Sequence, residues 1–315
     1  MNGRPCLRNM ARPFLKWVGG KTQLLKELEK SLPPCPKGGY DYVEPFLGGG
    51  ALFFHLQKTG RIKSALLNDA NAELILCYRV VKENVQGLID ELTKIEEEIP
   101  IDMEERKNQY FDVHRKKWNE HPCTDPLRMD LQKATKRAAL TIYLNKTCFN
   151  GLYRVNSDGK FNTPFGFPKN REICDEKTLK AAHVALQGVT LSNKSCFDLE
   201  IFEPRKWNFI YFDPPYRPIT STSFVAYDKS GFNDDHQEEL RDFAIDCEKN
   251  GIFVMLSNSD PTNFDDTDDH FDKLFDDFDL KRVFAKRMVN SDGGNRGKIR
   301  EILVTTKPEK SNLNK

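Results

Sequence analysis

A short apolar run that ends abruptly in an acid and two prolines constrains this chain more than any other feature. Residues 209–212 read Phe-Ile-Tyr-Phe, and Asp213-Pro214-Pro215-Tyr216 follows at once. Such a run is typical of a strand covered on both faces, as in a parallel sheet. Proline cannot donate to a sheet ladder, and it holds the preceding residue extended. The pattern predicts an α/β fold with Asp213 and the Pro214 carbonyl at the carboxyl edge of the sheet, where such folds bind ligands. A rigid turn with a solvated acid is the alternative.

Alternating strand and helix patterns extend this prediction along the chain. Residues 40–83 read as strand, glycine loop, helix, strand and helix, which is the order of a βαβ unit. The following segment is helical and charged until two short runs flank Ser157-Asp158-Gly159, which is a hairpin signal. The alternation then returns. We predict a discontinuous α/β domain of residues 10–80 and 180–307, an inserted helical and hairpin domain of residues 81–179, and a polar tail at 308–315.

Composition limits the class of protein. Hydrophobic residues make up 38% of the 315 residues and charged residues 30%, which suits a globular chain. Because the net charge is only +1, any surface that binds nucleic acid must be a local patch. Eight cysteines without a C-x-x-C pair argue against a metal cluster or a disulfide framework and favour the cytoplasm. We expect neither a signal peptide nor a membrane span. Nine aspartates at 260–279 predict a solvated helix face.

The first predicted strand leads into a glycine loop. Glu44-Pro45-Phe46 precedes Gly48-Gly49-Gly50, and glycines at this place let the backbone approach a ligand closely. No G-K-[ST] follows, so a phosphate-binding P-loop is not indicated. Asp69 ends the next predicted strand, where an acid in nucleotide-binding βαβ units accepts hydrogen bonds from ribose hydroxyls. A helix N-cap is the alternative role of Asp69.

Several motifs, in this order, make the chain resemble a known family. The resemblance is to the Dam-type (D12 class) DNA adenine-N6 methyltransferases, and it covers residues 12–306. The matching pieces are F-L-K-W-V-G-G-K-T (14–22), V-E-P-F-L-G-G-G (43–50), L-N-D-A-N-A-E-L-I (67–75), F-N-G-L-Y-R-V-N (149–156), K-F-N-T-P-F-G (160–166), Y-F-D-P-P-Y (211–216), L-S-N-S (256–259) and G-G-N-R-G-K-I-R-E-I (293–302).

The resemblance implies an enzyme with a Rossmann-like domain that transfers a methyl group from S-adenosylmethionine to a flipped adenine. No metal is needed, because the donor is already activated. The implied catalytic residues are Asp213, Pro214, Pro215 and Tyr216. The implied cofactor residues are Trp17, Lys21, Glu44, Phe46, Gly48, Asp69, Phe197 and Asp213. Cys196 stands where relatives often have Asp, and we expect Asp198 to replace that acid.

The resemblance also implies double-stranded DNA as the partner and a role such as restriction-modification. The implied DNA-contacting residues are Asn150, Arg154, Asn156, Lys160 and Arg296. Arg154 would read a guanine, with a plain phosphate contact as the alternative. GATC is the leading target, although Phe167 stands where many GATC-reading relatives have Arg. We expect a cytoplasmic monomer, nucleoid-associated if the source is bacterial, with a dimer as the alternative. A methyltransferase of RNA or protein and a catalytically inactive DNA-binding relative are the rival interpretations.

Overall fold

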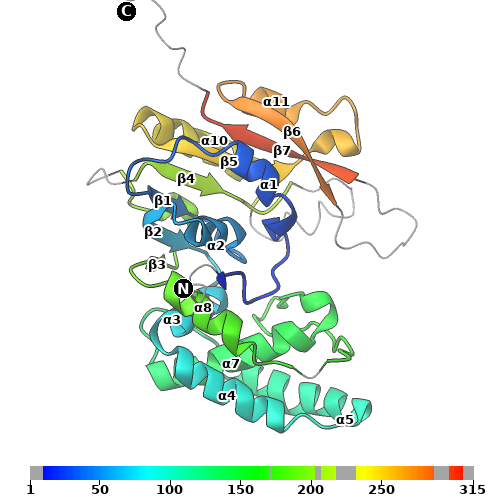
Figure 1. Ribbon diagram of the computed structural model, residues 1–315. Helices are drawn as coiled ribbons and strands as arrows, with labels where there is room; N and C mark the ends of the chain where they lie inside the picture. Colours follow the sequence, from blue (N-terminus) through cyan, green and yellow to red (C-terminus); the bar gives the residue numbers. More distant parts are fainter. Residues whose placement is uncertain (1–9, 171, 203–206, 218–231, 287–297, 308–315) are drawn as a thin grey trace, which may run out of the picture. The chain divides into compact units, whose positions relative to one another are not determined.

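The computed structural model of the chain describes residues 10–170, 172–202, 207–217, 232–286 and 298–307 (Figure 1). Its strands form a seven-stranded sheet with the order β3-β2-β1-β4-β5-β7-β6. The chain divides into two compact units, and β2 contributes residues to both. The predicted mixed α/β, Rossmann-like fold is confirmed.

The two units are discontinuous in sequence. Unit 1 comprises Met1–Lys21, Leu47–Ile62 and Leu66–Ser195. Unit 2 comprises Thr22–Phe46, Lys63–Ala65 and Cys196–Lys315. The predicted catalytic and recognition domains were defined by function, whereas these two units are defined by compactness. The predicted domain boundaries therefore stay a prediction.

The strands explain the apolar runs of the sequence. They are β1 (Tyr40–Glu44), β2 (Ile62–Asn68), β3 (Thr190–Ser192), β4 (Phe209–Phe212), β5 (Phe253–Ser259), β6 (Asp279–Lys286) and β7 (Lys298–Thr305). In unit 2, β4 pairs in parallel with β1 and β5, whereas β7 runs antiparallel to β5 and β6. Every residue of β1 and β4 is buried, as expected for strands covered on both faces. The strand order reverses between β1 and β4, which marks the switch point where α/β sheets bind ligands.

Unit 1 is mainly helical. Its helices are α2 (Ala51–Lys58), α3 (Ala72–Glu83), α4 (Val85–Glu97), α5 (Met103–Asn108), a π-helical stretch (Gln109–Arg115), α6 (Lys116–Glu120), α7 (Leu131–Thr147), a 3₁₀ turn (Phe149–Gly151) and α8 (Glu176–Ala185). Helices α3, α4, α7 and α8 lie side by side (Figure 1). Helix α7 is buried along most of its length, and its Arg137 forms a 2.6 Å ion pair with Glu73 of α3 while lying over the Trp118 ring. The pairing compensates the two buried charges, and the apolar faces around them hold the bundle that carries the hairpin.

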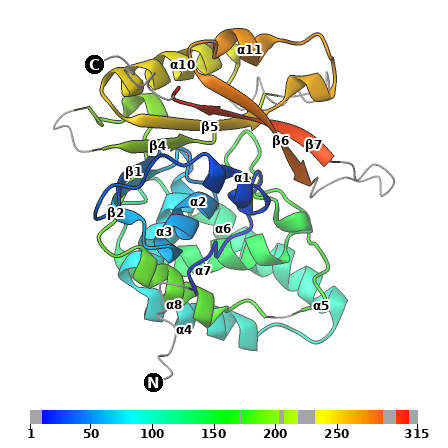
Figure 2. The same ribbon diagram turned by 45° about the horizontal axis from the view of Figure 1, so that its top comes forward.

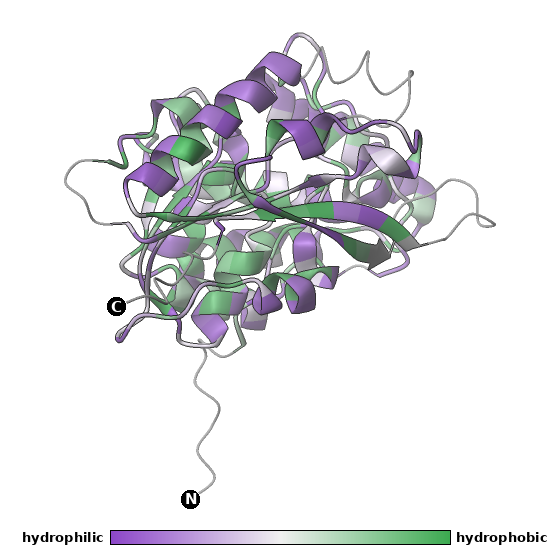
Figure 3. Cartoon of the chain, turned by 90° about the horizontal axis from the view of Figure 1, so that it is seen from above, coloured by the Kyte–Doolittle hydropathy of each residue, from purple (hydrophilic) through white to green (hydrophobic). Residues whose placement is uncertain are grey.

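Helices cover the sheet of unit 2. They are α1 (Leu25–Lys30), α10 (Asp234–Lys249), α11 (His270–Leu274) and the 3₁₀ turns Lys21–Gln23, Cys196–Asp198 and Pro261–Asn263, the first of which begins in unit 1. Helices α10 and α11 lie on one face of β5, β7 and β6 (Figures 1 and 2). Figure 3 shows the strands largely green and the helices striped with purple, the pattern of an amphipathic cover over an apolar sheet. Helix α10 begins at a capping box formed by Asn233 and His236.

The prediction for the aspartate-rich segment is right about solvent exposure for most of its aspartates and wrong about the helix. Residues 260–279 contain one short helix, α11, and are otherwise mostly turns. Asp260 is fully buried, and its carboxylate forms ion pairs with Arg282 and Arg300 at 3.2 and 3.5 Å. The aspartates at 260 and 265 accept hydrogen bonds from backbone N–H groups two residues on, so several of them form turns instead of a helical face.

Candidate active site and nucleic-acid interface

Two catalytic candidates, Asp213 and Tyr216, follow the carboxyl end of β4 in unit 2. Asp213 is half-buried, and its Oδ1 accepts a hydrogen bond from the Ser257 hydroxyl at 3.0 Å. The Tyr216 hydroxyl donates to Oε2 of Glu301 at 2.6 Å. Burial, together with the negative charges of Asp213 and Glu301, raises the pKa of Tyr216 well above its usual value, so the ring carries a neutral hydroxyl. Neither Ser257 nor Glu301 was assigned a role from the sequence.

The backbone around these residues is held by side chains from the neighbouring elements. Asn258 Oδ1 accepts from the Arg217 N–H at 3.2 Å, and the Ser259 hydroxyl donates to the Arg217 carbonyl at 2.7 Å. Gln237 of α10 donates to the Pro215 carbonyl at 3.4 Å. Within the described ranges, the Pro214 carbonyl has no hydrogen-bond partner. The loop therefore presents this carbonyl from a fixed backbone.

An aromatic cluster and a buried acid complete the site in unit 2. Phe197 and Phe232 are stacked 6.4 Å apart with their planes within 9°, and the Phe46 ring meets Phe232 edge-on. His236 at the start of α10 stacks on Phe232. The sequence indicated Phe46 and Phe197 but neither of these partners. Glu44, at the end of β1, is buried and accepts a hydrogen bond from the neighbouring tyrosine.

Asp69 organises the glycine loop of unit 1. Its Oδ2 accepts from the Gly48 N–H and its Oδ1 from the Asn71 N–H, both at 2.9 Å. Burial raises the pKa of Asp69 to about 6, against the lowering effect of these two N–H donors. The alternative role of Asp69 as the cap of α3 is wrong, because Asn71 is the N-cap and accepts from the Leu74 N–H at 3.1 Å.

Trp17 packs against the same glycine loop. A Cβ at Gly48, whose φ of +48° already favours glycine, would lie 3.1 Å from Trp17 Cδ1. On its other side Trp17 stacks on Tyr153, with ring centroids 5.3 Å apart. The Lys21 ammonium donates to the Gly19 carbonyl. Unit 1 thus brings Trp17, Gly48 and Asp69 together, with Tyr153 as a neighbour that the sequence did not single out, while Lys21 is tied to the Gly19 turn.

The predicted hairpin is confirmed as a short one. Its arms meet in isolated bridges, one of which joins Val155 to Phe161, and the Asn156 carboxamide oxygen accepts from the Asp158 and Lys160 N–H groups. Asn156 therefore forms the turn. Arg154, Asn156 and Lys160 are exposed together on this hairpin.

Of the two remaining DNA-contact candidates, Asn150 and Arg296, the structure describes only Asn150. Asn150, before the hairpin, is exposed in the left-handed conformation at φ 56°. Arg296 lies outside the described residues. Arg300, in β7, is occupied within unit 2 by Asp260 and by the Thr262 carbonyl.

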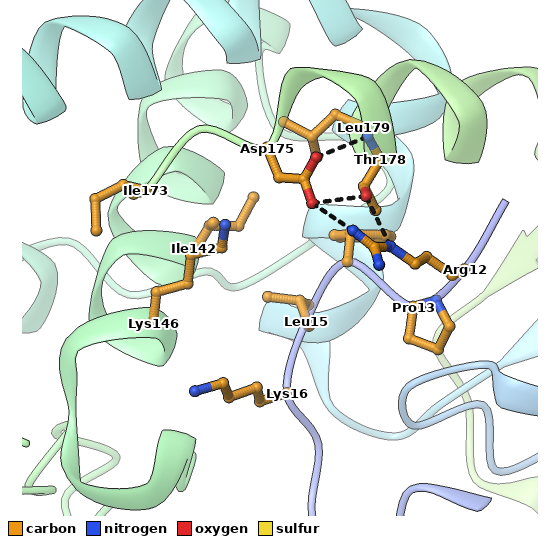
Figure 4. A pocket seen from close by; sticks show the side chains of 11 residues that line it. Arg12, Pro13, Leu15, Lys16, Ile142, Lys146, Ile173, Asp175, Thr178 and Leu179 are labelled. Atoms are coloured by element: carbon orange, nitrogen blue, oxygen red, sulfur yellow. Dashed lines mark hydrogen bonds and ion pairs between the residues drawn. The ribbon is translucent and has the colours of Figure 1, made fainter. Parts of the chain in front are cut away.

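A pocket of about 250 Å³ lies in unit 1 between the N-terminal arm, α7 and α8 (Figure 4). Arg12 is held there by Asp175 at 2.9 Å and by Thr178 at 3.0 Å. The Lys146 side chain reaches into the pocket (Figure 4), and burial lowers its pKa, partly offset by nearby acids. Lys16 stands exposed at its edge. Three basic side chains, Arg12, Lys16 and Lys146, therefore line this pocket beside one acid, Asp175.

Other kinds of site find no support in the described part of the chain. The seven described cysteines are all unpaired, and no cluster of His, Cys, Asp or Glu there could hold a metal ion. None of the described helices is both long enough and apolar enough to span a bilayer.

Comparison with known proteins identifies the family. The family model of D12 class N6 adenine-specific DNA methyltransferases matches residues 17–289. The type II methyltransferase M.MjaIII of Methanocaldococcus jannaschii is 42% identical, over 93% of this chain and 98% of the relative. M1.LlaDCHI of Lactococcus lactis subsp. cremoris is 37% identical (93% and 95%), and the DNA adenine methylase of Vibrio cholerae is 32% identical (95% and 98%). The chain therefore belongs to the D12 class of N6 adenine-specific DNA methyltransferases, enzymes that take their methyl group from S-adenosylmethionine.

Proposed function

We propose that this enzyme methylates adenine N6 within one short duplex sequence, with GATC as the leading target. The observation that carries the proposal is the pair of acceptors at the end of β4, the Asp213 carboxylate and the Pro214 carbonyl, beside the ring of Tyr216. The family acts on DNA, which argues against the rival RNA and protein substrates. An inactive relative is disfavoured because Asp213 of this motif is present and Trp17, Lys21 and Asp69 are intact.

The proposed chemistry needs two hydrogen-bond acceptors. The amino group of adenine is a weak nucleophile because its lone pair is delocalised into the ring. Asp213 and the Pro214 carbonyl accept hydrogen bonds from its two N–H bonds, which favours a pyramidal nitrogen with a localised lone pair. The loop is held by Gln237 and Asn258, so little reorganisation accompanies the reaction. When bound, S-adenosylmethionine supplies a methyl group activated by its sulfonium charge.

The residues present fit this donor. Asp69 offers a carboxylate, fixed by two N–H groups, to ribose hydroxyls. A Cβ at Gly48 would press on the Trp17 ring, so glycine lets the loop backbone pack closely against this predicted cofactor residue. In unit 2 the Phe197 ring provides an apolar face for an adenine ring, with Phe46 beside the same cluster. We assign Glu44 and Lys21 to the polar groups of the methionine part.

Cofactor binding should depend on the charge of Asp69. Ribose hydroxyls donate to the carboxylate, so protonation below a pKa of about 6 removes acceptors. The dissociation constant should be flat above pH 7 and rise about tenfold per pH unit below 6. Calorimetric titration from pH 5 to 8 measures this, with circular dichroism to show that the protein stays folded.

The Asp69→Asn variant is the control for this titration. It should bind weakly at every pH and show a flat profile, because the amide does not titrate. A wild-type constant that does not change between pH 5 and 8 would contradict the assignment of Asp69 to the ribose.

Tyr216 is expected to act mainly through its ring. Stacking on the flipped base is worth about 1–3 kcal/mol, so Tyr216→Ala should slow transfer by about 10- to 100-fold. Tyr216→Phe keeps the face but loses the hydrogen bond to Glu301, and should lose only a few-fold. Single-turnover rates test this order, and a Phe variant as slow as the Ala variant would contradict it.

We propose that residues 81–179 carry DNA recognition and that residues 10–80 and 180–307 carry catalysis. The exposed hairpin presents Arg154 for a guanine, and Asn150, Asn156 and Lys160 lie in or beside it. The pocket with Arg12, Lys16 and Lys146 is a candidate contact for DNA phosphates. We further propose that the enzyme acts in the cytoplasm as a monomer on one duplex.

A panel of short duplexes tests the proposed target. Tritium transfer is measured on a duplex with one GATC and on duplexes in which each of its four base pairs is changed in turn. The proposal predicts transfer to the GATC adenine and a loss with every change. Equal rates across the panel, or a faster rate on another four-base sequence, would overturn GATC as the target.

A further inference from the structure

Two acids at the ends of neighbouring parallel strands are each backed by a buried tyrosine. On β1, Tyr42 stands two residues before Glu44, and on β4, Tyr211 stands two residues before Asp213. Residues two apart on a strand share a face. The Tyr42 hydroxyl donates directly to Glu44 at 2.9 Å. Tyr211 is connected to Asp213 through a third side chain, Ser257 of β5.

The direction of these hydrogen bonds follows from proton counting. Ser257 Oγ lies 3.0 Å from Asp213 Oδ1 and 2.8 Å from the Tyr211 hydroxyl. An ionised carboxylate only accepts, so the single hydroxyl proton of Ser257 goes to Asp213. Ser257 must then accept from Tyr211. Burial and the charge of Asp213 raise the pKa of Tyr211 well above its usual value, so it retains the proton that it donates.

The Ser257 hydrogen bond acts on the side chain of Asp213, whereas the contacts that hold the loop act on its backbone. The backbone of the loop is held by Asn258 and Gln237, through Arg217 and Pro215. These contacts do not determine how the Asp213 carboxylate rotates. Ser257 and Tyr211 are each 1% exposed, so water does not compete for their bonds.

We propose that Ser257, supported by Tyr211, is a positioning residue that fixes the rotation of the Asp213 carboxylate toward the adenine amino group. The inference rests on the role proposed above for Asp213. It gives a role to Ser257 of the L-S-N-S segment, because the hydroxyl of this serine donates a hydrogen bond to the Asp213 carboxylate.

The test compares Ser257→Ala with Ser257→Thr, Tyr211→Phe and a matched control. The control is Ser64→Ala, because Ser64 also donates to a carboxylate of unit 2, that of Asp41 at the opposite end of β1 from the site. Single-turnover methyl transfer is measured with saturating DNA and cofactor, and the dissociation constants of both are measured by titration.

Ser257→Ala should transfer about 10- to 100-fold more slowly, the scale of one lost hydrogen bond to a charged group, with both dissociation constants unchanged. Ser257→Thr keeps the hydroxyl and should recover most of the rate. Tyr211→Phe should fall between them, and Ser64→Ala should match the wild type. A purely structural role would lower thermal stability without this selective loss of rate.

The inference is overturned if Ser257→Ala transfers within about twofold of the wild type, or if Ser64→Ala is equally slow. Should Ser257→Ala fail to fold, Tyr211→Phe decides in the same way. Asp213→Ala in the same assay separates the role of Asp213 from the role of Ser257. If Asp213→Ala is active, the catalytic role proposed for Asp213 is wrong. If Asp213→Ala is inactive and Ser257→Ala is normal, only the positioning role of Ser257 is wrong.

Discussion

Replacing Asp213 by alanine is expected to reduce methyl transfer by at least about 1,000-fold, because the variant loses a charged acceptor aimed at the reacting nitrogen. Cofactor binding should survive, since Asp69 and Lys21 lie in unit 1 and keep their contacts. Asp213→Asn should retain more activity, because its amide oxygen still accepts a hydrogen bond, although without the charge. A tritium-transfer assay beside calorimetric titration of the cofactor separates the two effects.

The outcome discriminates between two uses of the same carboxylate. If the alanine variant binds cofactor normally and does not transfer, Asp213 acts in the chemical step. If binding is lost together with transfer, its main role lies in holding the cofactor. Near-normal transfer by Asp213→Ala would contradict the proposed role of Asp213 as an acceptor for the adenine amino group.

The second large effect is expected at Arg154, and it concerns which sequence is methylated. The Arg154 Nε and Nη2 donate to Asn162 at 2.7 and 3.3 Å, which orients the guanidinium at the exposed hairpin. If the remaining donors bind O6 and N7 of a guanine, Arg154→Ala should cost about 1–3 kcal/mol on the preferred site and relax discrimination at one base pair. Rates on duplexes carrying each single substitution measure this.

Lys160→Ala is the matched control, since Lys160 is exposed on the other arm of the hairpin. A phosphate contact weakens binding about equally on every sequence and lowers the salt slope by about one unit. That result is expected for Lys160. The same uniform loss with Arg154→Ala would mean that Arg154 touches only phosphate and that the guanine is read elsewhere.

The sequence predicted the strands at the site well, because burial leaves a direct trace in composition. Residues 209–212 are apolar without alternation, and β4 is buried on both faces. The prolines that follow cannot continue the ladder, so the end of this strand was also predictable. The hairpin turn was predictable for a similar reason, since Asp158-Gly159 favours the turn that Asn156 closes.

Partners distant in sequence could not be predicted in this way. Ser257 meets Asp213 only because β4 and β5 pair in register, and Glu301 meets Tyr216 from a strand 85 positions away. No local pattern marks either contact. The cluster of Phe232 and His236 on Phe197 depends likewise on the packing of α10.

Two local predictions were ambiguous for a physical reason. Asp69 and Asn71 are both good helix-capping residues, and only the structure shows that Asn71 takes this role and leaves Asp69 to the glycine loop. The aspartates at 260–279 suggested a solvated face because aspartate is usually exposed. Asp260 is the exception, since two arginines from β6 and β7 compensate its burial.

A map of methylated adenines in a genome shows directly whether the enzyme modifies one short sequence through Asp213. The protein is expressed in a host that lacks adenine methylation, with the Asp213→Ala variant as the control, and N6-methyladenine is mapped at single-base resolution. We expect methylation of the adenine in nearly every copy of one short duplex sequence, GATC, and none with the variant. Methylation without a common sequence, or an equal pattern in the Asp213→Ala strain, would contradict this expectation.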